Sequence, residues 1–495
     1  MNILFVASEM EPLARVGGLA DVIGTLPKRL SAQGADVRVV LPYYSRVKTY
    51  LSAAGIKPKD VVKDLVVCID WLPVRGTIKE IELSGVTVYL VEQEEFYGRK
   101  YIYSTPAADY EDNDLRFGFL SLAALEAAKT LDFKPDIIHC HDWQTALLPI
   151  CLRWRKHLRD DEFFKNTRVV FTIHNISFQG QDDRTILDKF GLPEFLFTSQ
   201  GLEFYGKVNL LKGGILYSDV VTTVSPTYAE ELRKKEYAYG LEAVMKWVSR
   251  KQDNLVGILN GIDYDEWNPE TDTYIYKNYG TQSLAKKPVN REKLREEFGL
   301  DTSVDKPVLG IVSKLTEQKG TDLLLESVPQ IIDLGYQIVI VGAGDEKYEQ
   351  AVKRAGKRYG KNLSVRIAVD DTSLERKVYA GSDMFLVPSF EPCGLGQIIA
   401  LRYGTVPVVR GTGGLLDTVR DYTEDADDGN GFIFYEFSMV SMLDALLRAI
   451  SAYEDKAAWK KLQTRAMRED FSWKASAKYL GLYKEVLERN PPYPA

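Results

Sequence analysis

Residues 384–397, MFLVPSFEPCGLGQ, run from a short apolar segment into a turn rich in proline and glycine, and the helix-like IIALRYG follows at 398–404. The apolar segment Met384–Val387 predicts a buried strand. Glu391 would then lie at the carboxyl edge of a sheet, beside the amides of Cys393–Gly396 in the first turn of a helix. Such amides favour an anion, and the carboxylate could bind sugar hydroxyls. The stretch indicates a nucleotide-sugar site, although a structural turn with a solvated glutamate also fits it.

Apolar segments of this kind alternate with helix-period segments along most of the chain, which is typical of parallel α/β layers. Each half predicts a doubly wound sheet whose binding crevice lies at the carboxyl ends of its strands. The strands that we expect lie at 3–8, 37–42, 86–92, 136–141, 168–174, 220–225, 308–313, 337–344, 363–369, 384–389 and 406–411.

A chain of 495 residues is too long for one ordinary core, so we expect two domains. The turn-forming stretch LNGIDYDEWNPETD at 259–272 marks the boundary between them. We therefore expect an N-terminal Rossmann-like domain over 1–260, a C-terminal one over 261–470, and a C-terminal helical segment over 471–495. Two similar halves would face each other across a deep cleft, where ligands should lie.

Composition excludes several classes of protein. A net charge of −7 argues against a nucleic-acid partner. The four cysteines have neither CxxC nor zinc-like spacing, so we expect reduced thiols. No apolar run has membrane-spanning length, and the first residues enter a strand without a targeting pattern. We expect a cytoplasmic protein, or a stromal one if a plastid transit peptide has been removed.

The loop after the first predicted strand carries Arg15, Gly17 and Gly18 ahead of a helix. Paired glycines let the backbone approach an oxyanion closely, and the arginine adds a cation. Two-glycine loops are common before helices, so a purely structural role is the alternative.

Three of the four histidines, His139, His141 and His174, fall at ends of predicted strands on one sheet edge. Satisfied core imidazoles are the alternative, but this clustering favours a functional site. No histidine and carboxylate set has metalloenzyme spacing, so we expect no metal. Asp142 and Trp143 follow His141 and offer a carboxylate and an aromatic face to a sugar.

Polar loops complete the candidate set. Tyr110 and Asn113 lie in a loop that enters a helix, where an N-cap role is the alternative for the asparagine. Lys314 and Lys319 follow a predicted strand and could neutralise a diphosphate leaving group, although loop charges are often simply solvated. The segment RGTGGLLDTV at 410–419 repeats the glycine-rich anion turn, with a hydroxyl donor in its threonine.

Taken in chain order, MNILFVASEMEPLARVGGLADVIGTLP, DNDLRFGFLSLAALE, HCHDWQTALLP, FTIHNISFQG, NLLKGG, VSPTYAEEL, LNGIDYDEWNPETD, VSKLTEQKG, FEPCGLGQ and GTGGLLDTV resemble bacterial glycogen synthases and plant starch synthases. The resemblance covers nearly the whole chain. It implies the GT-B fold, two Rossmann-like domains around a cleft, with the last helix crossing back to the first domain. It also implies transfer of glucose from ADP-glucose to the non-reducing end of an α-1,4-glucan with retention, without a metal or other cofactor.

The resemblance also implies roles for the motif residues. ADP-glucose and the glucan would be the partners, with neither nucleic acid nor membrane. Catalysis would rest on Asp142, His174, Lys314, Lys319 and Glu391. ADP-glucose would contact Arg15, Gly17, Gly18, Asn260, Cys393, Gly394, Leu395, Gly396, Thr412 and Gly413. The acceptor side would carry Tyr110, Asn113 and Trp143.

The chain departs from the family pattern at several of these positions. Arg15 replaces the usual lysine of the first loop, and Lys314 replaces the usual arginine after the later strand. Both charges survive, but a guanidinium fork and an ammonium ion are not equivalent at a phosphate. Gly396 replaces a threonine, and Ile399 stands where many retaining transferases carry a second glutamate. These changes bear on rate and donor preference.

Two alternatives stay open. One is a UDP-glucose-using glucan synthase of the same fold, and the other is a turnover-deficient glucan-binding or priming homologue. A nicotinamide dehydrogenase is disfavoured, because no G-x-G-x-x-G with a properly spaced acidic residue follows the first predicted strand.

Overall fold

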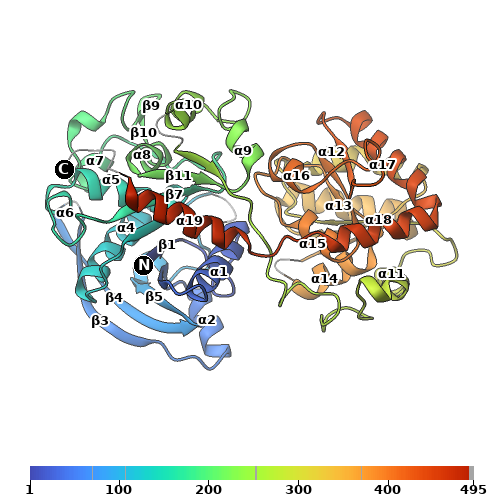
Figure 1. Cartoon of the computed structure of the whole chain (residues 1–495), viewed down its shortest axis with the longest axis horizontal. Helices are drawn as coiled ribbons and strands as arrows, with labels where there is room; N and C mark the ends of the chain where they lie inside the picture. The colour runs from blue at the N-terminus through green and yellow to red at the C-terminus, as the bar shows by residue number, and fades with distance from the viewer. Residues whose placement is uncertain (70, 106–107, 251–253, 369–370, 490–495) are drawn as a thin grey trace. The chain divides into compact units, whose positions relative to one another are not determined.

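The computed structural model describes residues 1–69, 71–105, 108–250, 254–368 and 371–489. The chain divides into two compact units, drawn in Figure 1. Unit 1 comprises Met1–Asn260 and Trp473–Ala495, and unit 2 comprises Gly261–Ser472. No helix in the described part of the chain is long and apolar enough to cross a membrane.

The described residues of unit 1 form a sheet in the order β12-β11-β7-β6-β1-β2-β5-β4-β3. Neighbours from β12 to β5 pair in parallel, whereas β4 pairs antiparallel with both β5 and β3. The bounds are β1 (Asn2–Val6), β2 (Asp36–Pro42), β3 (Lys59–Ile69), β4 (Leu72–Leu83), β5 (Val86–Glu92), β6 (Ile137–His141), β7 (Arg168–Ile173), β11 (Val220–Thr223) and β12 (Leu255–Gly257).

All six strands predicted in this half are confirmed, with ends that shift by at most a few residues. The β3–β4 hairpin and the short β12 were not predicted. In β3, KDVVKDLVVCI, only Leu65, Val67 and Ile69 are buried, and charged residues interrupt the apolar pattern. A second, antiparallel sheet in the order β8-β10-β9 consists of β8 (Gln181–Asp182), β9 (Glu203–Phe204) and β10 (Lys207–Asn209).

Helix α1 packs through one apolar stripe, whereas α4 is buried over most of its surface. In α1, Leu19, Ile23, Leu26 and Leu30 recur at helical spacing and are buried. The helices are α1 (Gly18–Ser31), α2 (Ser45–Ala53), α3 (Glu94–Tyr97), α4 (Asn113–Thr130), α5 (Leu147–Trp154), α6 (Lys156–Arg159), α7 (Ile186–Lys189), α8 (Leu210–Tyr217), α9 (Pro226–Glu231), α10 (Glu242–Arg250) and α19 (Ala475–Glu488).

In unit 2 the described residues form a sheet in the order β15-β14-β13-β16-β17-β18, and every neighbouring pair is parallel. The five predicted strands are confirmed as β13 (Val308–Val312), β14 (Gln337–Gly342), β15 (Leu363–Ile367), β16 (Met384–Val387) and β17 (Val406–Arg410). The sixth, β18 (Phe432–Phe434), is too short for its pattern to predict it. The predicted α/β class with two doubly wound sheets is confirmed.

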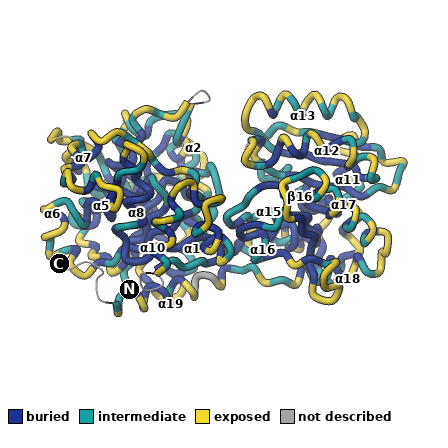
Figure 2. Tube along the Cα trace, turned by 90° about the horizontal axis from the view of Figure 1, so that it is seen from above, coloured by how far each residue is buried: buried dark blue, intermediate teal, exposed yellow. Residues whose placement is uncertain are grey.

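Helices cover this second sheet as well. The exposed residues of α13 gather on its outer turns in Figure 2, while the strands are buried. The helices of unit 2 are α11 (Lys287–Phe298), α12 (Thr321–Asp333), α13 (Glu346–Tyr359), α14 (Thr372–Gly381), α15 (Gly396–Arg402), α16 (Gly413–Thr418), α17 (Met439–Glu454) and α18 (Lys456–Arg468).

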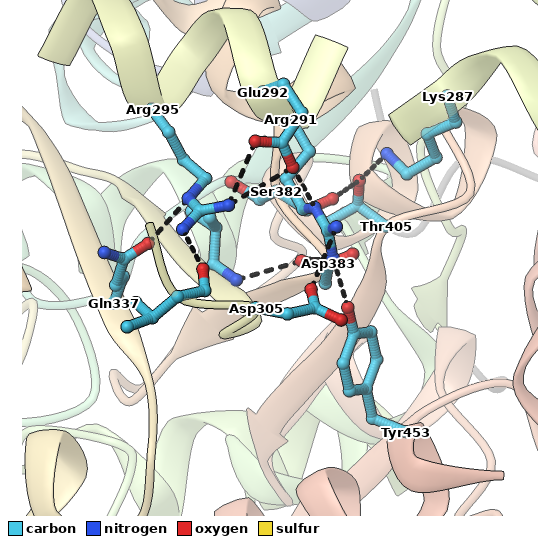
Figure 3. Close-up of polar contacts among 12 residues, drawn as sticks. Lys287, Arg291, Glu292, Arg295, Asp305, Gln337, Ser382, Asp383, Thr405 and Tyr453 are labelled. Carbon is cyan, nitrogen blue, oxygen red and sulfur yellow. Dashed lines mark hydrogen bonds and ion pairs between the residues drawn. The ribbon is translucent and has the colours of Figure 1, made fainter. Parts of the chain in front are cut away.

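A buried polar cluster lies at the amino ends of the unit 2 strands (Figure 3). We call Lys287, Arg291, Asp383 and Thr405 the Arg291–Asp383 cluster. Asp383 precedes β16 and accepts a 2.9 Å hydrogen bond from the N–H of Val308, the first residue of β13. Arg291 lies 3.9 Å from Asp383, and Lys287 donates to the hydroxyl of Thr405 at 2.7 Å. The cluster therefore ties α11 to three strands.

Candidate functional site

Asp142 directly follows β6 and has an unusual backbone conformation. Its φ of 54° and ψ of −176° lie in a region that only glycine adopts readily. The carboxylate accepts a 2.7 Å hydrogen bond from the N–H of His174, which follows β7. Burial raises the pKa of Asp142 to about 7. The surrounding structure thus holds a carboxyl group in a strained, fixed position at the carboxyl edge of the sheet.

The three clustered histidines have different roles. Nδ1 of His139 hydrogen-bonds the hydroxyl of Tyr483 in α19 at 2.7 Å, and Nε2 hydrogen-bonds Thr172 at 2.6 Å. His139 is therefore a satisfied core imidazole, as the alternative interpretation has it. Nδ1 of His141 lies 3.0 Å from Nε2 of His174. Burial lowers the pKa of His174 to about 3, so this ring is neutral at physiological pH.

The first loop is organised by a carboxylate that the sequence analysis did not select. Oε2 of Glu9 accepts hydrogen bonds from the N–H groups of Val16, at 2.6 Å, and Gly17, at 2.8 Å. Its Oε1 accepts a 2.5 Å bond from the hydroxyl of Tyr103. The N–H of Gly17, which the sequence predicts to bind a phosphate, therefore already donates a hydrogen bond to Glu9. Glu9 directly follows the predicted strand 3–8, and this position is the signal that could have identified it.

Space around this loop remains open. A Cβ added at Gly17 or Gly18 would meet no atom within 4 Å, so nothing in unit 1 requires glycine there by packing. Arg15 lies 3.7 Å from Asp21 in α1, in a loose and partly exposed ion pair. The arginine therefore lies beside a glycine-rich segment that a ligand can approach closely.

Residues predicted to face the acceptor are well ordered by internal contacts. The guanidinium groups of Arg99 and Arg116 lie 4.6 Å and 4.9 Å from the ring centre of Tyr110. Asn113 donates to the carbonyl of Tyr103 at 2.9 Å and accepts from Arg116 at 2.5 Å. Both polar ends of Asn113 are thus engaged in shaping the loop around Tyr110.

Two further predicted residues of unit 1 differ in their surroundings. Trp143 packs edge-on against Phe117 at 5.3 Å, and a Cβ on Gly180 would come within 2.4 Å of its indole ring. The ring therefore covers a glycine that has a φ of 59°. Asn260 is buried, and its side-chain oxygen has no hydrogen-bond partner among the described residues. A buried unpaired acceptor of this kind suits a hydroxyl donor from a ligand.

Unit 2 places the predicted charged residues at the carboxyl edge of its sheet. Lys319 and Glu391 form a salt bridge, with side chains that are 27% and 14% exposed. Ser389 hydrogen-bonds the same carboxylate oxygen at 2.7 Å. Lys314 follows β13 and is exposed. A cation and a carboxylate therefore lie together where the strands β13 and β16 end.

The two glycine-rich turns pack tightly against each other. Helix α15 begins at Gly396, so the preceding residues Cys393, Gly394 and Leu395 form the turn rather than the first helical turn that we expected. Gly413 follows the buried Thr412 and has a φ of 49°, and a Cβ there would lie 2.1 Å from the carbonyl oxygen of Glu391. Glycine is therefore required where α16 begins.

Gly396 has a packing reason as well. A Cβ at this position would lie 3.1 Å from the ring of Phe385 and 3.3 Å from the hydroxyl of Tyr379. These neighbours leave little room for the threonine that the family pattern usually carries there. Within the described residues, no group of three or more His, Cys, Asp and Glu could hold a metal ion.

Comparisons with known proteins match both units. Residues 2–247 match the family model of the starch synthase catalytic domain, and residues 290–465 match that of glycosyl transferases group 1. The glycogen synthase of Geotalea daltonii is 47% identical, and that of Thermotoga maritima 44%; each alignment covers 99% of both chains.

Solved structures give the same picture. The catalytic domain of Starch Synthase IV from Arabidopsis thaliana, bound to ADP and acarbose, matches 98% of this chain with a TM-score of 0.89 at 32% identity; 99% of that chain is covered. A sucrose-phosphate synthase from Thermosynechococcus elongatus matches 98% of both chains with a TM-score of 0.61 at 18% identity, and shares the fold.

Proposed function

Because the chain belongs to the glycogen and starch synthase family of glycosyltransferases, we propose that it transfers glucose from ADP-glucose to the non-reducing end of an α-1,4-glucan with retention of configuration. The Lys319–Glu391 pair is the observation that carries this proposal. A partly exposed cation beside a carboxylate suits a donor that has both a diphosphate and sugar hydroxyls.

One comparison supports the donor assignment. A starch synthase with the same fold binds ADP and acarbose. In this chain the charges at Arg15 and Lys314 are kept, although each residue type is exchanged relative to the family pattern. The exchange affects how each cation contacts a phosphate, because only arginine offers a planar fork of donors. We expect the altered contacts to change the rate more than the donor class.

The reaction is a substitution on the front face of the glucose. The bond between C1 and the β-phosphate oxygen breaks, and C1 bonds to the O4 of the acceptor. The proton of that hydroxyl goes to the departing phosphate. Lys314 and Lys319 stabilise the negative charge that develops on ADP, while Glu391 holds hydroxyls of the transferred sugar.

The residues of unit 1 orient the glucose. His174 is neutral, so its ring can both donate and accept hydrogen bonds without adding charge. Asp142 is fixed by the N–H of His174 and offers a directed carboxyl group to a sugar hydroxyl. The unpaired side-chain oxygen of Asn260 accepts a hydrogen bond from another sugar hydroxyl. The mechanism requires no metal ion and no covalent intermediate on a side chain.

A direct assay tests the proposal. Purified protein is incubated with maltooligosaccharide and either ADP-glucose or UDP-glucose, and nucleotide release is measured together with glucan elongation. We expect elongation with ADP-glucose and a newly formed α-linkage by NMR. Preference for UDP-glucose would establish the alternative donor. Glucan binding without nucleotide release would establish the turnover-deficient homologue. We also propose that the activity lies in the cytoplasm.

A further inference from the structure

Two exposed tyrosines in unit 1 occupy backbone positions that disfavour tyrosine. Tyr205 joins β9 to β10 and is 84% exposed, with a φ of 51°; Gly206 after it has a φ of 81°. Tyr239 is 52% exposed, with a φ of 49°, and is followed by Gly240 at 87°. Both pairs have positive φ values at two central positions, as in a type I′ turn, where asparagine, aspartate or glycine is preferred. A bulky residue there is an outlier.

The same chain makes this type of turn with small residues elsewhere. The hairpin between β4 and β5 turns through Ser84 and Gly85, which have φ values of 51° and 77°. The fold alone therefore does not require an aromatic ring at such a turn. An aromatic ring at both strained positions, exposed to solvent, points to a ligand-binding role.

The two tyrosine turns lie side by side. A Cβ on Gly240 would lie 2.9 Å from the ring of Phe204 and 3.6 Å from that of Tyr205. The rings of Phe204 and Tyr205 pack edge to face at 4.7 Å. Figure 1 shows β9 and β10 close to α10, which begins directly after the second turn. One small region thus presents both rings.

This region is continuous with the candidate site through the loop 174–180. The loop begins at His174, whose N–H is bound by Asp142. Near its end, the side chain of Gln179 donates to the carbonyl of Tyr239 at 3.2 Å. Phe178, one residue earlier, is 57% exposed. A third exposed aromatic residue therefore belongs to the segment that carries His174.

We propose that Phe178, Tyr205 and Tyr239 form a chain-anchoring surface that binds α-1,4-glucan at residues remote from its reacting end. Flat aromatic faces stack on the apolar C–H faces of glucose rings, and tyrosine hydroxyls can bind their polar edges. Rigid aromatic side chains also lose little conformational entropy on contact. The inference rests on the proposed function, because it assigns the extended acceptor of that reaction.

The strained turns permit a sharp test. Asparagine tolerates positive φ, so the double variant Tyr205→Asn/Tyr239→Asn removes both rings without a loss of thermal stability. We expect the KM for glycogen to rise about tenfold or more, since each ring contributes about three- to tenfold in affinity. If the surface binds glucose units remote from the reacting end, the kcat/KM for maltotriose, which has only three units, stays within about twofold. The variant Tyr205→Phe/Tyr239→Phe keeps the rings and retains most of the affinity.

Trp71→Asn is the matched control. Trp71 is also an exposed aromatic residue of unit 1 at positive φ, with 87% exposure and a φ of 59°, but it lies in the connection between β3 and β4. We expect this variant to behave as the parent protein. An unchanged glycogen KM in the double asparagine variant, an equal loss with maltotriose, or the same loss in Trp71→Asn would overturn the inference.

A binding measurement separates this inference from the proposed function. Retardation of the full chain in gels that contain glycogen reports on the surface without any transfer of glucose. If the parent protein is retarded and the double variant is not, the surface is established even when ADP-glucose is not a donor. If the parent protein elongates glucan and both proteins are retarded equally, only the surface is wrong.

Discussion

In unit 2, the two edges of one parallel sheet carry charged residues in opposite settings. At the amino edge, Lys287 is 4% exposed and donates to the hydroxyl of Thr405 at 2.7 Å (Figure 3). It also donates to the carbonyl of Ala380 at 2.8 Å. At the carboxyl edge, Lys319 is 27% exposed and pairs with a single carboxylate, that of Glu391. One lysine is enclosed by the protein, and the other remains accessible to a ligand.

The difference in exposure between Lys287 and Lys319 predicts which charged residues stabilise unit 2 and which act on a ligand. Burial lowers the pKa of Lys287 to about 7 and raises that of Asp383, so both charges are held at a cost that their hydrogen bonds and nearby opposite charges must offset. The pair at the carboxyl edge is partly exposed, so it contributes less to folding. Mutations at the amino edge should therefore impair stability, and mutations at the carboxyl edge should impair turnover.

The largest effect is expected for Asp383→Ala. The change removes a buried carboxylate beside Arg291, which keeps its contacts with Glu292 and Asp305, and it leaves the N–H of Val308 without its acceptor. Breaking a buried ionic contact costs about 3–5 kcal/mol, which lowers the melting temperature of a unit this size by about 10 °C. Calorimetry would detect the shift. Asp383→Asn keeps an acceptor for Val308 and should lose less. A melting temperature within about 1 °C of the parent would contradict the stabilising role.

Lys319→Ala should show the converse. Loss of one cation that stabilises the leaving group raises the barrier by about 3 kcal/mol, so kcat falls about a hundredfold. The melting temperature changes little, since a partly exposed ion pair contributes less than about 1 kcal/mol. Steady-state assays with ADP-glucose measure the first effect and calorimetry the second. Lys319→Arg keeps the charge and should recover part of the rate. Unchanged turnover in Lys319→Ala would refute the proposed role.

For Asp142→Asn we expect an effect on stability that depends on pH. The folded-state pKa of about 7 exceeds the ordinary value of 3.8, so folding takes up a proton between these pH values. The stability that this group contributes is complete below about pH 4 and is lost as the pH rises through about 7. The asparagine variant cannot ionise at this position, so its stability does not fall in this way as the pH rises. We expect it to gain about 2 kcal/mol over the parent between about pH 4 and pH 8, a figure reduced for partial exposure.

Thermal unfolding of both proteins across this pH range measures the gain, and assays of the same samples should show reduced transfer in the variant at every pH. A stability difference that does not vary with pH would mean that Asp142 is ionised in the folded protein.

The sequence predicts the central strands because buried parallel strands are near-continuous apolar runs. It does not predict β3, whose charged residues face solvent in an antiparallel hairpin. It also predicts that polar candidates gather at strand ends, and the structure places Asp142, His174, Lys319 and Glu391 there. Their roles in catalysis stay predictions.

Other features depend on distant contacts that local pattern does not encode. Lys287 and Arg291 belong to KPVNREKLREEF, which has the composition of a surface helix, and the local pattern does not show that Lys287 is buried or that Arg291 lies near the distant Asp383. The amide of Gly17 is taken by Glu9, which a glycine motif alone does not indicate. Similarly, the strain at Tyr205 arises from the register of a two-residue hairpin.

The smallest effect is expected for Ser389→Ala. The Ser389 hydroxyl donates a 2.7 Å hydrogen bond to the Glu391 oxygen that also pairs with Lys319. If this bond orients the carboxylate toward the sugar, its loss should raise the barrier by about 1 kcal/mol and lower kcat/KM about fivefold, with the melting temperature unchanged. Ser389→Thr keeps the hydroxyl as a control. An equal loss of kcat/KM in both variants would assign the effect to packing around Pro388 and not to the hydrogen bond.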